Sequence, residues 1–326
     1  MQATKLTPEF ALIRAHFAAL GAARSDVLLG VGDDCALLAV PAGQQLAVSI
    51  DTLAAGVHFL PDCDPEAIGH KCLAVGLSDL AAMGAEPAWA TLALTLPATL
   101  PRESPDWLAA FAHGFGRLAR AHRVALVGGD TTRGPLSITV QVHGLVPVGA
   151  EIRRAGARPG DLVCVSGTLG DAGLALRELL AGQAPSPARR ARLERPTPRV
   201  ALGLALRGLA SAMIDCSDGL AADLGHILEA SGVGAELDLA ALPLEAAVAA
   251  AVDLDGDWGL PLAAGDDYEL CFCLPPAYLE RLPEIAARCG CPLTPIGRIL
   301  SGPGLVCRAP DGAAVALERV GFDHFH

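Results

Sequence analysis

Aspartate residues follow apolar runs at several points in the sequence, and this pattern could do chemistry. The runs VLLGVGDD, QLAVSID, LAVGLSD, RVALVGGD and SAMIDCSD end in Asp33 and Asp34, Asp51, Asp79, Asp130, and Asp215 and Asp218. Taken singly, an aspartate after a strand is a turn former or a helix N-cap, and the Ser-Asp pairs before LAAMG and LAADLG fit capping. Capping does not explain five such segments in glycine-rich surroundings, so we expect the carboxylates to gather at one site.

Carboxylates that gather in this way imply bound cations, because like charges at close range would otherwise force protonation. Aspartate and serine oxygens, without an enrichment of cysteine or histidine, are ligands for hard ions and favour Mg²⁺ over Zn²⁺.

Glycines accompany the aspartates and would let a phosphate group approach the backbone. They occur as GVG before Asp33, as GG before Asp130, and in SGTLGDAG at 166–173, which opens a predicted helix. The sequence has neither a G-x-x-x-x-G-K-[ST] loop nor an H-R-D catalytic loop, which disfavours P-loop and protein-kinase architectures. Multi-metal phosphoryl transfer outside those families is the chemistry that the residues favour.

The composition limits the classes of partner. The chain has 326 residues, 52% of them hydrophobic, and 36 acidic against 24 basic side chains, for a formal charge of −12. This charge argues against nucleic acid or an anionic membrane as the main partner. Only Lys5 and Lys71 are lysines, so a phosphate site must rely on arginine, backbone N–H groups or cations. Without a signal-peptide pattern or a membrane span, we expect a cytoplasmic protein.

The elements that must position these residues alternate between strands and helices, which indicates two mixed α/β domains. The first, residues 1–148, has strands at 27–31, 45–50, 89–96, 123–129 and 136–147 and helices at 68–83 and 107–122. The second, residues 149–326, has strands at 161–167, 212–218, 235–240 and 268–275 and helices at 172–181, 220–230, 245–252 and 279–288. A proline-rich connector, residues 184–199, precedes a further helix. The ten cysteines form no C-x-x-C pair and are interpreted mainly as small buried hydrophobes.

Six motifs together identify a family resemblance. GVGDDCALL, SIDTLAAGVHF, LSDLAAMGAEP, VGGDTTRGPL, IDCSDGLAADL and GDDYELCF, in this order and spacing, resemble the thiamine-monophosphate kinase family. Its superfamily also contains aminoimidazole ribonucleotide synthetase and selenophosphate synthetase. The resemblance runs from about Phe10 to GFDHF at the C-terminus.

The resemblance implies ATP-dependent phosphorylation of thiamine monophosphate to thiamine diphosphate, by direct transfer with several Mg²⁺ ions and no dedicated general base. It also implies a homodimer in which the N-terminal sheets of two subunits pack into a barrel, while the C-terminal sheet is flanked by helices. The N-terminal domain would then bind ATP and Mg²⁺ and form the dimer, and the C-terminal domain would complete the nucleotide and substrate site.

The resemblance also assigns roles to individual residues. The implied metal ligands are Asp34, Ser49, Ile50, Asp51, Asp79, Asp130, Asp215 and Asp218. The implied ATP-binding residues are Gly129, Asp130, Arg154 and Ser217, and those that hold thiamine are His58, Asp267 and Phe322. Position 50 is Ile where relatives often have Thr, so only its backbone carbonyl is expected to act; Asp266 stands where relatives often carry Glu. We expect Asp33 mainly to shape its loop.

Other interpretations of these residues stay open at this point. His58 could be an ordinary partly buried histidine, Phe322 could pack in the core, and Arg154 could be solvated. Arg195 between its prolines could contact phosphate or form a helix-entry turn. For the whole chain, the alternatives are another ATP-dependent synthetase of the same superfamily and a non-catalytic module that binds divalent cations.

Overall fold

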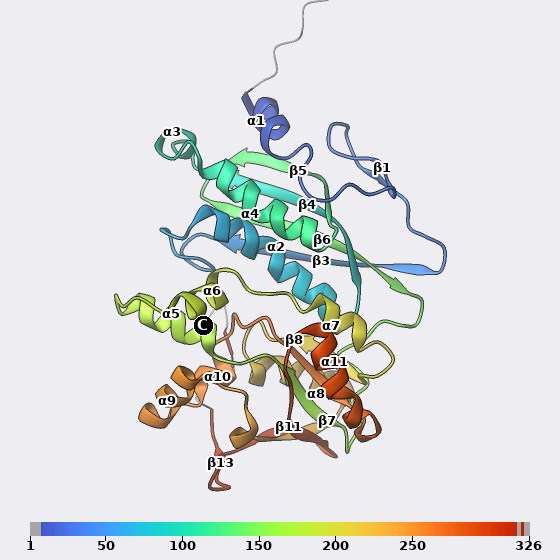
Figure 1. Ribbon diagram of the computed structural model, residues 1–326, viewed down its shortest axis with the longest axis vertical. Coiled ribbons are helices and arrows are strands. Elements are labelled where there is room, and N and C mark those ends of the chain that lie inside the picture. Colours follow the sequence, from blue (N-terminus) through green and yellow to red (C-terminus); the bar gives the residue numbers. More distant parts are fainter. Residues whose placement is uncertain (1–7, 318–320, 323–326) are drawn as a thin grey trace, which may run out of the picture. The chain divides into compact units, whose positions relative to one another are not determined.

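The computed structural model describes residues 8–317 and 321–322. The chain forms two compact units, one of Met1–Leu80 with Glu86–Val148 and one of Ala81–Ala85 with Gly149–His326. Helices and strands occur in both, which confirms the predicted mixed α/β class (Figure 1).

The N-terminal unit is built on a four-stranded sheet. The strand order is β3-β6-β4-β5, with β4 and β5 parallel and the other neighbours antiparallel. A short β1–β2 hairpin forms a separate two-stranded sheet. The elements in chain order are α1 (Pro8–His16), β1 (Val27–Leu29), β2 (Leu37–Leu38), β3 (Gln44–Ala54), α2 (Pro65–Ala82), β4 (Glu86–Leu96), α3 (Leu100–Glu103), α4 (Trp107–Ala121), β5 (Ala125–Arg133) and β6 (Ser137–Pro147).

Helices α2 and α4 cover one face of this sheet (Figure 1). Strand β6 alternates between buried and partly buried residues, as expected for a strand with one covered face. The two helices cross closely because each has a glycine at the contact. A Cβ on Gly69 would lie 2.0 Å from the Phe111 carbonyl oxygen, and one on Gly114 would lie 1.9 Å from that of Glu66. These glycines let α2 approach its neighbour and place its residues over the sheet.

The C-terminal unit is built on a seven-stranded sheet with the strand order β13-β12-β9-β11-β7-β10-β8. Its neighbours are antiparallel except for β12 and β9. The elements are β7 (Leu162–Ser166), α5 (Asp171–Leu180), α6 (Pro187–Glu194), α7 (Val200–Ala205), β8 (Ala212–Asp215), α8 (Leu220–Ser231), β9 (Gly234–Asp238), η1 (Leu239–Ala241), α9 (Ala246–Asp255), α10 (Gly259–Ala263), β10 (Leu270–Leu274), η2 (Pro276–Arg281), α11 (Leu282–Cys289), β11 (Leu293–Leu300), β12 (Gly304–Arg308) and β13 (Ala314–Val315).

All five residues of β10 are buried, and β10 lies between β7 and β8. A continuous apolar run is the pattern of a strand that is covered on both faces. Eight of the ten cysteines are buried and none forms a disulfide, in agreement with their interpretation as small hydrophobes. Among the described residues, no helix is both long and apolar enough to span a membrane.

The connector and the segment before β10 differ from the sequence expectation. The connector contains helix α6, which Ser186 caps by accepting a hydrogen bond from the Arg189 N–H at 3.3 Å. Helix α10, just before the GDDYEL motif, has no counterpart among the predicted elements. The predicted strand at 268–275 is shorter, because Tyr268 has a φ of +50° that an extended strand cannot contain.

Candidate active site

Ser49, Asp51 and Asp79 come together in the N-terminal unit, and we call these three residues the acidic group. The Ser49 hydroxyl donates a hydrogen bond to Asp79 Oδ2. Asp51 Oδ2 is buried and accepts no hydrogen bond from any described residue. A Cβ added at Gly76 of α2 would lie 3.4 Å from that oxygen, so a glycine keeps the space beside it narrow but open. The two carboxylates and the hydroxyl thus lie close together, and one carboxylate oxygen, Asp51 Oδ2, has no hydrogen-bond donor among the described residues.

The electrostatics of the acidic group are unfavourable for two ionised carboxylates. Burial raises the pKa of Asp51 to about 7, and the charge of Asp79 adds to the effect. A cation would relieve both causes, because it supplies an opposite charge and a partner for the unpaired oxygen. The donors are all oxygens, which suits Mg²⁺. The described residues contain no cluster of three or more His, Cys, Asp or Glu side chains arranged to hold a metal, so the acidic group is a partial ligand set.

Three of the predicted aspartates lie inside an element and not at its end. Asp51 lies within β3, Asp79 within α2 and Asp130 within β5, and only Asp215 ends a strand. The prediction that the strand ends before the aspartate was therefore wrong for Asp51 and Asp130, whereas Asp79 lies inside the helix predicted at 68–83. The reason is that polar residues are tolerated in mid-element wherever they face a site, so the acid does not mark the boundary.

The alternation of β3 explains how Ser49 and Asp51 share a face while Ile50 does not. Asp51 pairs with Val140 of β6, which is buried, whereas Ile50 pairs with Gln141 and is 61% exposed. Successive side chains of a strand point to opposite faces. The Ile50 side chain is therefore directed away from the acidic group, which leaves only its backbone for a role there.

Asp130 lies on β5, three strands away from β3 in the sheet. At about 4.8 Å between neighbouring strands, the separation is about 14 Å, too far for one magnesium ion to contact both Asp51 and Asp130. Gly129 beside it has a φ of +150°, and a Cβ there would lie 1.9 Å from the Leu92 carbonyl oxygen. Only glycine fits at this position of the GGD motif, and Asp130 is exposed next to it.

The GVGDD loop lies close to Asp130. Val31 of the loop and Asp130 line the same small cavity. Asp33 and Asp34 are both exposed, and the Asp34 N–H donates to Asp33 Oδ1 at 2.9 Å. Asp33 therefore uses one carboxylate oxygen to fix its own loop, which agrees with the expectation that it shapes the loop.

His58 follows β3 in a tight turn. Its Nδ1 accepts a hydrogen bond from the Ala54 N–H at 3.0 Å, which puts the proton of the neutral ring on Nε2. The His58 carbonyl accepts from Lys71 Nζ at 3.1 Å, and Lys71 is buried in α2. One of the two lysines in the chain thus helps to hold this turn.

The IDCSD loop connects β8 with α8 in the C-terminal unit. Asp215 is buried, and Ser217 and Asp218 are partly buried. The capping interpretation was wrong for both Ser-Asp pairs: Asp79 lies inside α2, and at α8 a different residue satisfies the first backbone donors. The N–H groups of Asp218 and Gly219 both donate to Asp223 Oδ2 at 3.1 Å.

Asp223 was missed by the sequence analysis, although it stands in the quoted motif IDCSDGLAADL. It is buried, and burial together with the charge of Asp218 raises its pKa to about 7. The signal that could have found it is its spacing, because a carboxylate in the first turn of a helix can reach back to the backbone N–H groups before it.

The GDDYEL loop, residues 265–270, runs beside the IDCSD loop. Three backbone hydrogen bonds join them: Asp266 N–H to the Ser217 carbonyl at 2.8 Å, Tyr268 N–H to that of Cys216 at 2.8 Å, and Cys216 N–H to that of Glu269 at 2.7 Å. Asp266 and Tyr268 have φ values of +63° and +50°, which are unusual for residues other than glycine. The backbone is therefore held in a strained form on both sides of Asp267.

Asp267 is 3% exposed, so it has little access to solvent. Its Oδ2 accepts from the Gly170 N–H at 2.8 Å, and its Oδ1 is buried without a hydrogen-bond partner among the described residues. Burial raises the pKa of this carboxyl to about 7. Asp267 thus links its loop to the SGTLGDAG segment, and one of its oxygens can accept a further donor.

Phe322 and Arg154 contact the same unit through their backbones. The Phe322 N–H donates to the Asp218 carbonyl at 3.0 Å, and its side chain is 51% exposed, so it is not simple core packing. Arg154 is exposed, and its carbonyl accepts from Ser231 Oγ at 3.2 Å. Arg195 ends α6, with its N–H donating to the Ala191 carbonyl at 2.8 Å, so it lies at a helix exit and not at a helix entry.

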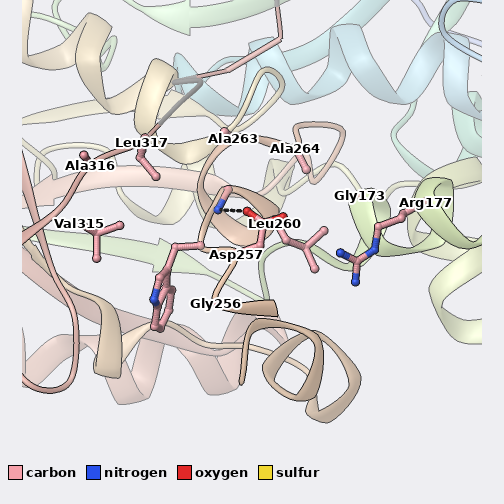
Figure 2. Close-up of a pocket in the computed structure, with 12 residues that line it drawn as sticks. Gly173, Arg177, Gly256, Asp257, Leu260, Ala263, Ala264, Val315, Ala316 and Leu317 are labelled. Carbon is pink, nitrogen blue, oxygen red and sulfur yellow. Dashed lines mark hydrogen bonds between the residues drawn. The ribbon is translucent and has the colours of Figure 1, made fainter. Parts of the chain in front are cut away.

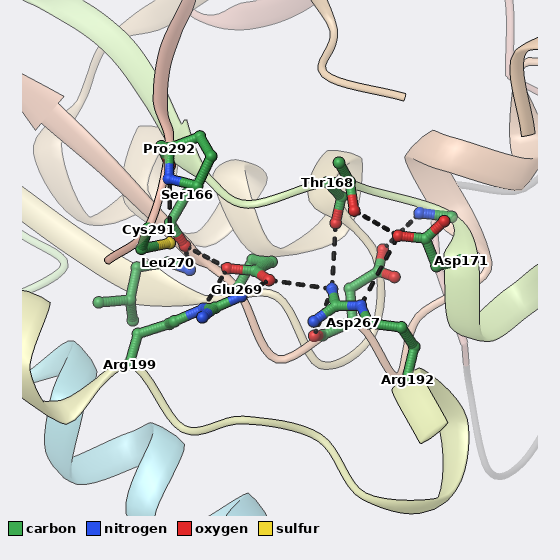
Figure 3. A network of polar contacts seen from close by, with 11 residues as sticks. Ser166, Thr168, Asp171, Arg192, Arg199, Asp267, Glu269, Leu270, Cys291 and Pro292 are labelled. Atoms are coloured by element: carbon green, nitrogen blue, oxygen red, sulfur yellow. Dashed lines mark hydrogen bonds and ion pairs between the residues drawn. The ribbon is translucent and has the colours of Figure 1, made fainter. Parts of the chain in front are cut away.

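Two arginines from the connector surround Glu269, and we call Arg192, Arg199 and Glu269 the arginine cluster (Figure 3). Arg192 forms an ion pair with Glu269 at 2.9 Å, and Arg199 donates to the same carboxylate through Nε at 2.7 Å and through a terminal nitrogen. None of the three was among the site residues predicted from the sequence. Arg192 and Glu269 are 77 positions apart in the sequence, so no local pattern could pair them.

A pocket of about 630 Å³ lies beside this region in the C-terminal unit (Figure 2). Gly173 and Arg177 of α5, Trp258 and Leu260, and residues 315–317 line it, together with Ala263 and Ala264 just before the GDDYEL loop. Arg177 forms an ion pair with Asp255 at 3.2 Å. The size is that of a small-molecule site, with an aromatic side chain in its wall.

Comparisons with known proteins agree with the geometry. Residues 32–146 match the model of the AIR synthase related protein N-terminal domain, and residues 158–309 match that of the C-terminal domain. The chain is 47% identical over 322 residues to the thiamine-monophosphate kinase of Escherichia coli K12, covering 97% of this chain and 98% of that protein.

Two solved structures are also similar. The crystal structure of thiamine-monophosphate kinase from Stenotrophomonas maltophilia K279a is 49% identical with a TM-score of 0.83, over 93% of this chain and 95% of that one. The structure of AaThiL complexed with AMPPCP and TMP is 33% identical with a TM-score of 0.76, over 88% and 89% of the two chains.

Proposed function

Because the chain belongs to the thiamine-monophosphate kinase family of AIR synthase related proteins, we propose that it phosphorylates thiamine monophosphate with ATP to give thiamine diphosphate and ADP. Membership of the family makes the chain a kinase. The observation within the structure that carries the proposal is the acidic group, where an unpartnered buried carboxylate oxygen calls for a cation beside a second carboxylate. The similar structure of AaThiL, which holds AMPPCP and TMP, supports the choice of substrates.

The proposed reaction needs no general base on the protein. A phosphate monoester has a second pKa of about 6, so it is largely dianionic at neutral pH and can itself attack. An oxygen of the acceptor phosphate forms a bond to the γ-phosphorus of ATP, the bond from that phosphorus to the β–γ bridging oxygen breaks, and ADP leaves with the electron pair. The obstacle is repulsion, since two unit charges about 4 Å apart cost about 4 kcal/mol at an effective dielectric constant of about 20.

We assign the metal-binding role in the N-terminal unit to Asp34, Ser49, Asp51, Asp79 and Asp130, with the Ile50 carbonyl. When bound, Mg²⁺ ions would neutralise the phosphates and hold them in line. The separation of about 14 Å between the strands of Asp51 and Asp130 supports more than one ion. Gly129, where a Cβ has no room, would let the nucleotide approach the backbone beside Asp130.

In the C-terminal unit, we assign metal binding to Asp215 and Asp218 and nucleotide binding to Ser217 and Arg154. Asp267 and Phe322 would hold the thiamine part, as would His58 of the N-terminal unit. The buried Asp267 oxygen suits a hydrogen-bond donor of the substrate, and the half-exposed Phe322 ring could stack on a heterocycle. The pocket beside the loop has room for a small organic molecule.

We also propose that the protein is a homodimer formed through the open face of the N-terminal sheet. Leu46, Val48 and Ile50 alternate along the edge strand β3 and are 45%, 49% and 61% exposed. A row of exposed apolar side chains on an edge strand favours association with a second sheet. Val48→Glu should give a monomer in analytical ultracentrifugation, whereas a dimer of unchanged stability would contradict this interface.

The test of the function is the release of ADP on addition of thiamine monophosphate, with equal amounts of ADP and thiamine diphosphate formed. Asp34→Asn and Asp218→Asn should lose activity by orders of magnitude and still fold, because each removes a ligand charge. Near-native turnover of both variants at saturating Mg²⁺ would refute the metal assignment. Isolation of a labelled phosphoprotein on the reaction pathway would refute direct transfer.

A further inference from the structure

Glu269 of the C-terminal unit is a buried carboxylate with several protein partners. It is 0% exposed, and it accepts hydrogen bonds from Ser166 Oγ and from two nitrogens of Arg199, in addition to its ion pair with Arg192 at 2.9 Å (Figure 3). Burial alone would oppose the charge of Arg199, but the hydrogen bonds and charge of Glu269 outweigh burial and raise the pKa of that guanidinium.

The arginine cluster joins three segments that are distant in sequence. Arg192 belongs to α6, and the terminal nitrogen that meets Glu269 also donates to the Thr168 carbonyl at 3.1 Å and to the Asp267 carbonyl at 3.4 Å. Its Nε lies 3.6 Å from Asp171 Oδ2. Through Arg192 the connector is tied both to the SGTLGDAG segment and to the GDDYEL loop.

The backbone that the cluster holds is strained and adjoins residues with proposed roles. Asp266 and Tyr268 have left-handed backbone conformations on either side of Asp267, and such conformations persist only where the surroundings enforce them. The Glu269 carbonyl also accepts the Cys216 N–H at 2.7 Å, in the IDCSD loop. A displacement of Glu269 would therefore move Asp267 and would disturb the loop of Ser217 as well.

The cluster itself is not a ligand site. Glu269 is fully covered, and protein donors already occupy both of its oxygens. Whatever the cluster contributes to the reaction must act through the position of other groups.

We propose that Arg192, Arg199 and Glu269 are positioning residues that fix the GDDYEL loop in the conformation that binds the acceptor substrate. This inference rests on the proposed function, because it assigns the acceptor to the loop of Asp267. It extends that function to the connector, which supplies both arginines.

The test compares Glu269→Gln with a matched control, Glu178→Gln. Glu178 pairs with Arg189 of the same helix α6, through hydrogen bonds of 2.7 and 3.3 Å, and both side chains are less than 20% exposed. Among the described residues, neither side chain forms a hydrogen bond or an ion pair with the GDDYEL loop. The control therefore removes a similar carboxylate charge, on α5, from the ion pair of another α6 arginine without touching the loop.

For Glu269→Gln we expect the KM for thiamine monophosphate to rise roughly ten- to a hundredfold, because small misplacements of binding groups are costly. The KM for ATP should change much less. Direct calorimetric binding of thiamine monophosphate, measured well below the unfolding temperature, should weaken to the same extent. Glu178→Gln should leave both quantities near the wild-type values even if it lowers the unfolding temperature.

An unchanged KM for thiamine monophosphate in Glu269→Gln, or an equal rise in Glu178→Gln, would overturn the proposal. If Glu269→Gln does not fold, Arg192→Lys decides, because it keeps the charge and loses the fork that reaches Thr168, Asp267 and Glu269. A raised KM for the acceptor alone supports positioning, and a wild-type KM refutes it. Failure of the proposed function is a separate result, since the wild type would then release no ADP with thiamine monophosphate.

Discussion

Asp51 in the acidic group and Glu269 in the arginine cluster are carboxylates with buried oxygens, but their neighbours carry opposite charges. Asp51 faces Asp79 and keeps one oxygen without a hydrogen-bond partner, whereas Glu269 is held by two guanidinium groups and a hydroxyl. The first arrangement is unstable until something positive enters, and the second is already neutralised by the protein. A buried charge therefore indicates a binding site only when the protein has left it unbalanced.

The two regions also differ in how far apart their interacting residues lie in the sequence. Ser49 and Asp51 are two residues apart on one face of β3. The partners of Glu269 lie 70 and 77 positions before it. The acidic group can be changed by local substitutions, whereas the arginine cluster depends on the packing of the whole C-terminal unit.

The largest effect is expected on turnover, when a charge of the acidic group is removed. Asp51→Asn keeps the size of the side chain and removes the charge that makes the acidic group a cation site. We expect thiamine-monophosphate-dependent ADP release to fall about 10³-fold, or about 4 kcal/mol in the activation barrier, as for other electrostatic groups of active sites. Leu53→Val, on the same strand and face, serves as the packing control. A fall of less than threefold at saturating Mg²⁺ would mean that Asp51 is not part of the metal site.

The next largest effect is expected on the free energy of unfolding, when the arginine cluster is changed. Glu269→Gln leaves two partly buried guanidinium groups facing an uncharged amide. Removing one partner of a buried ion pair typically costs about 3 to 5 kcal/mol. Denaturant unfolding should therefore show a fall of about that size in the free energy of unfolding. A loss of unfolding free energy below about 1 kcal/mol would show that water replaces the carboxylate and that the cluster is open to solvent.

Much of the fold could be predicted from the sequence, because the local signals agree with the final structure. The helix predicted at 107–122 is α4, Trp107–Ala121, and the strand predicted at 136–147 is β6, Ser137–Pro147. The connector was harder, because prolines and arginines suggested a linker. Its Ser186–Pro187 start and the Arg190–Glu194 pair at i,i+4 are helix signals that proline content concealed.

The site was less predictable, because its geometry depends on tertiary packing. The period of two along β3 was sufficient to place Ser49 and Asp51 on one face and Ile50 on the other. The helix predicted at 68–83 already contained Asp79, but the sequence of α2 did not show which turn of the helix would lie beside Ser49 and Asp51. The left-handed backbone at Asp266 and Tyr268 is also set by surroundings and not by residue type, since neither residue is glycine.

The effect of Asp51→Asn on the free energy of unfolding should be smaller, and its sign should reverse when Mg²⁺ is added. Without divalent cations at pH 8, Asp51→Asn should raise the free energy of unfolding by about 1 to 2 kcal/mol, because it removes a repelled charge whose pKa is raised to about 7. With saturating Mg²⁺ the wild type should gain more than the variant, since binding to the folded state stabilises it. Thermal unfolding with and without Mg²⁺ measures this. Equal gains for both proteins would contradict cation binding at Asp51.

The smallest effect concerns Asp267, whose pairing is intermediate between that of Asp51 and that of Glu269. One of its oxygens accepts a hydrogen bond, and the other is buried without a hydrogen-bond partner among the described residues. Burial raises its pKa from an ordinary 3.8 to about 7, so between these pH values the folded state binds more protons than the unfolded state. The free energy of unfolding should therefore fall as the pH rises from about 4 to about 7, and level off above that.

Asp267→Asn removes this contribution, because its amide does not titrate. The difference in unfolding free energy between wild type and variant should change by at least about 1 kcal/mol across that window, the equivalent of one pKa unit. Asp51 and Asp223 titrate in the same direction, but they are present in both proteins and cancel in the difference. Parallel profiles from pH 4 to 7 would mean that Asp267 stays ionised in the folded protein. Its buried oxygen would then be as well balanced as those of Glu269.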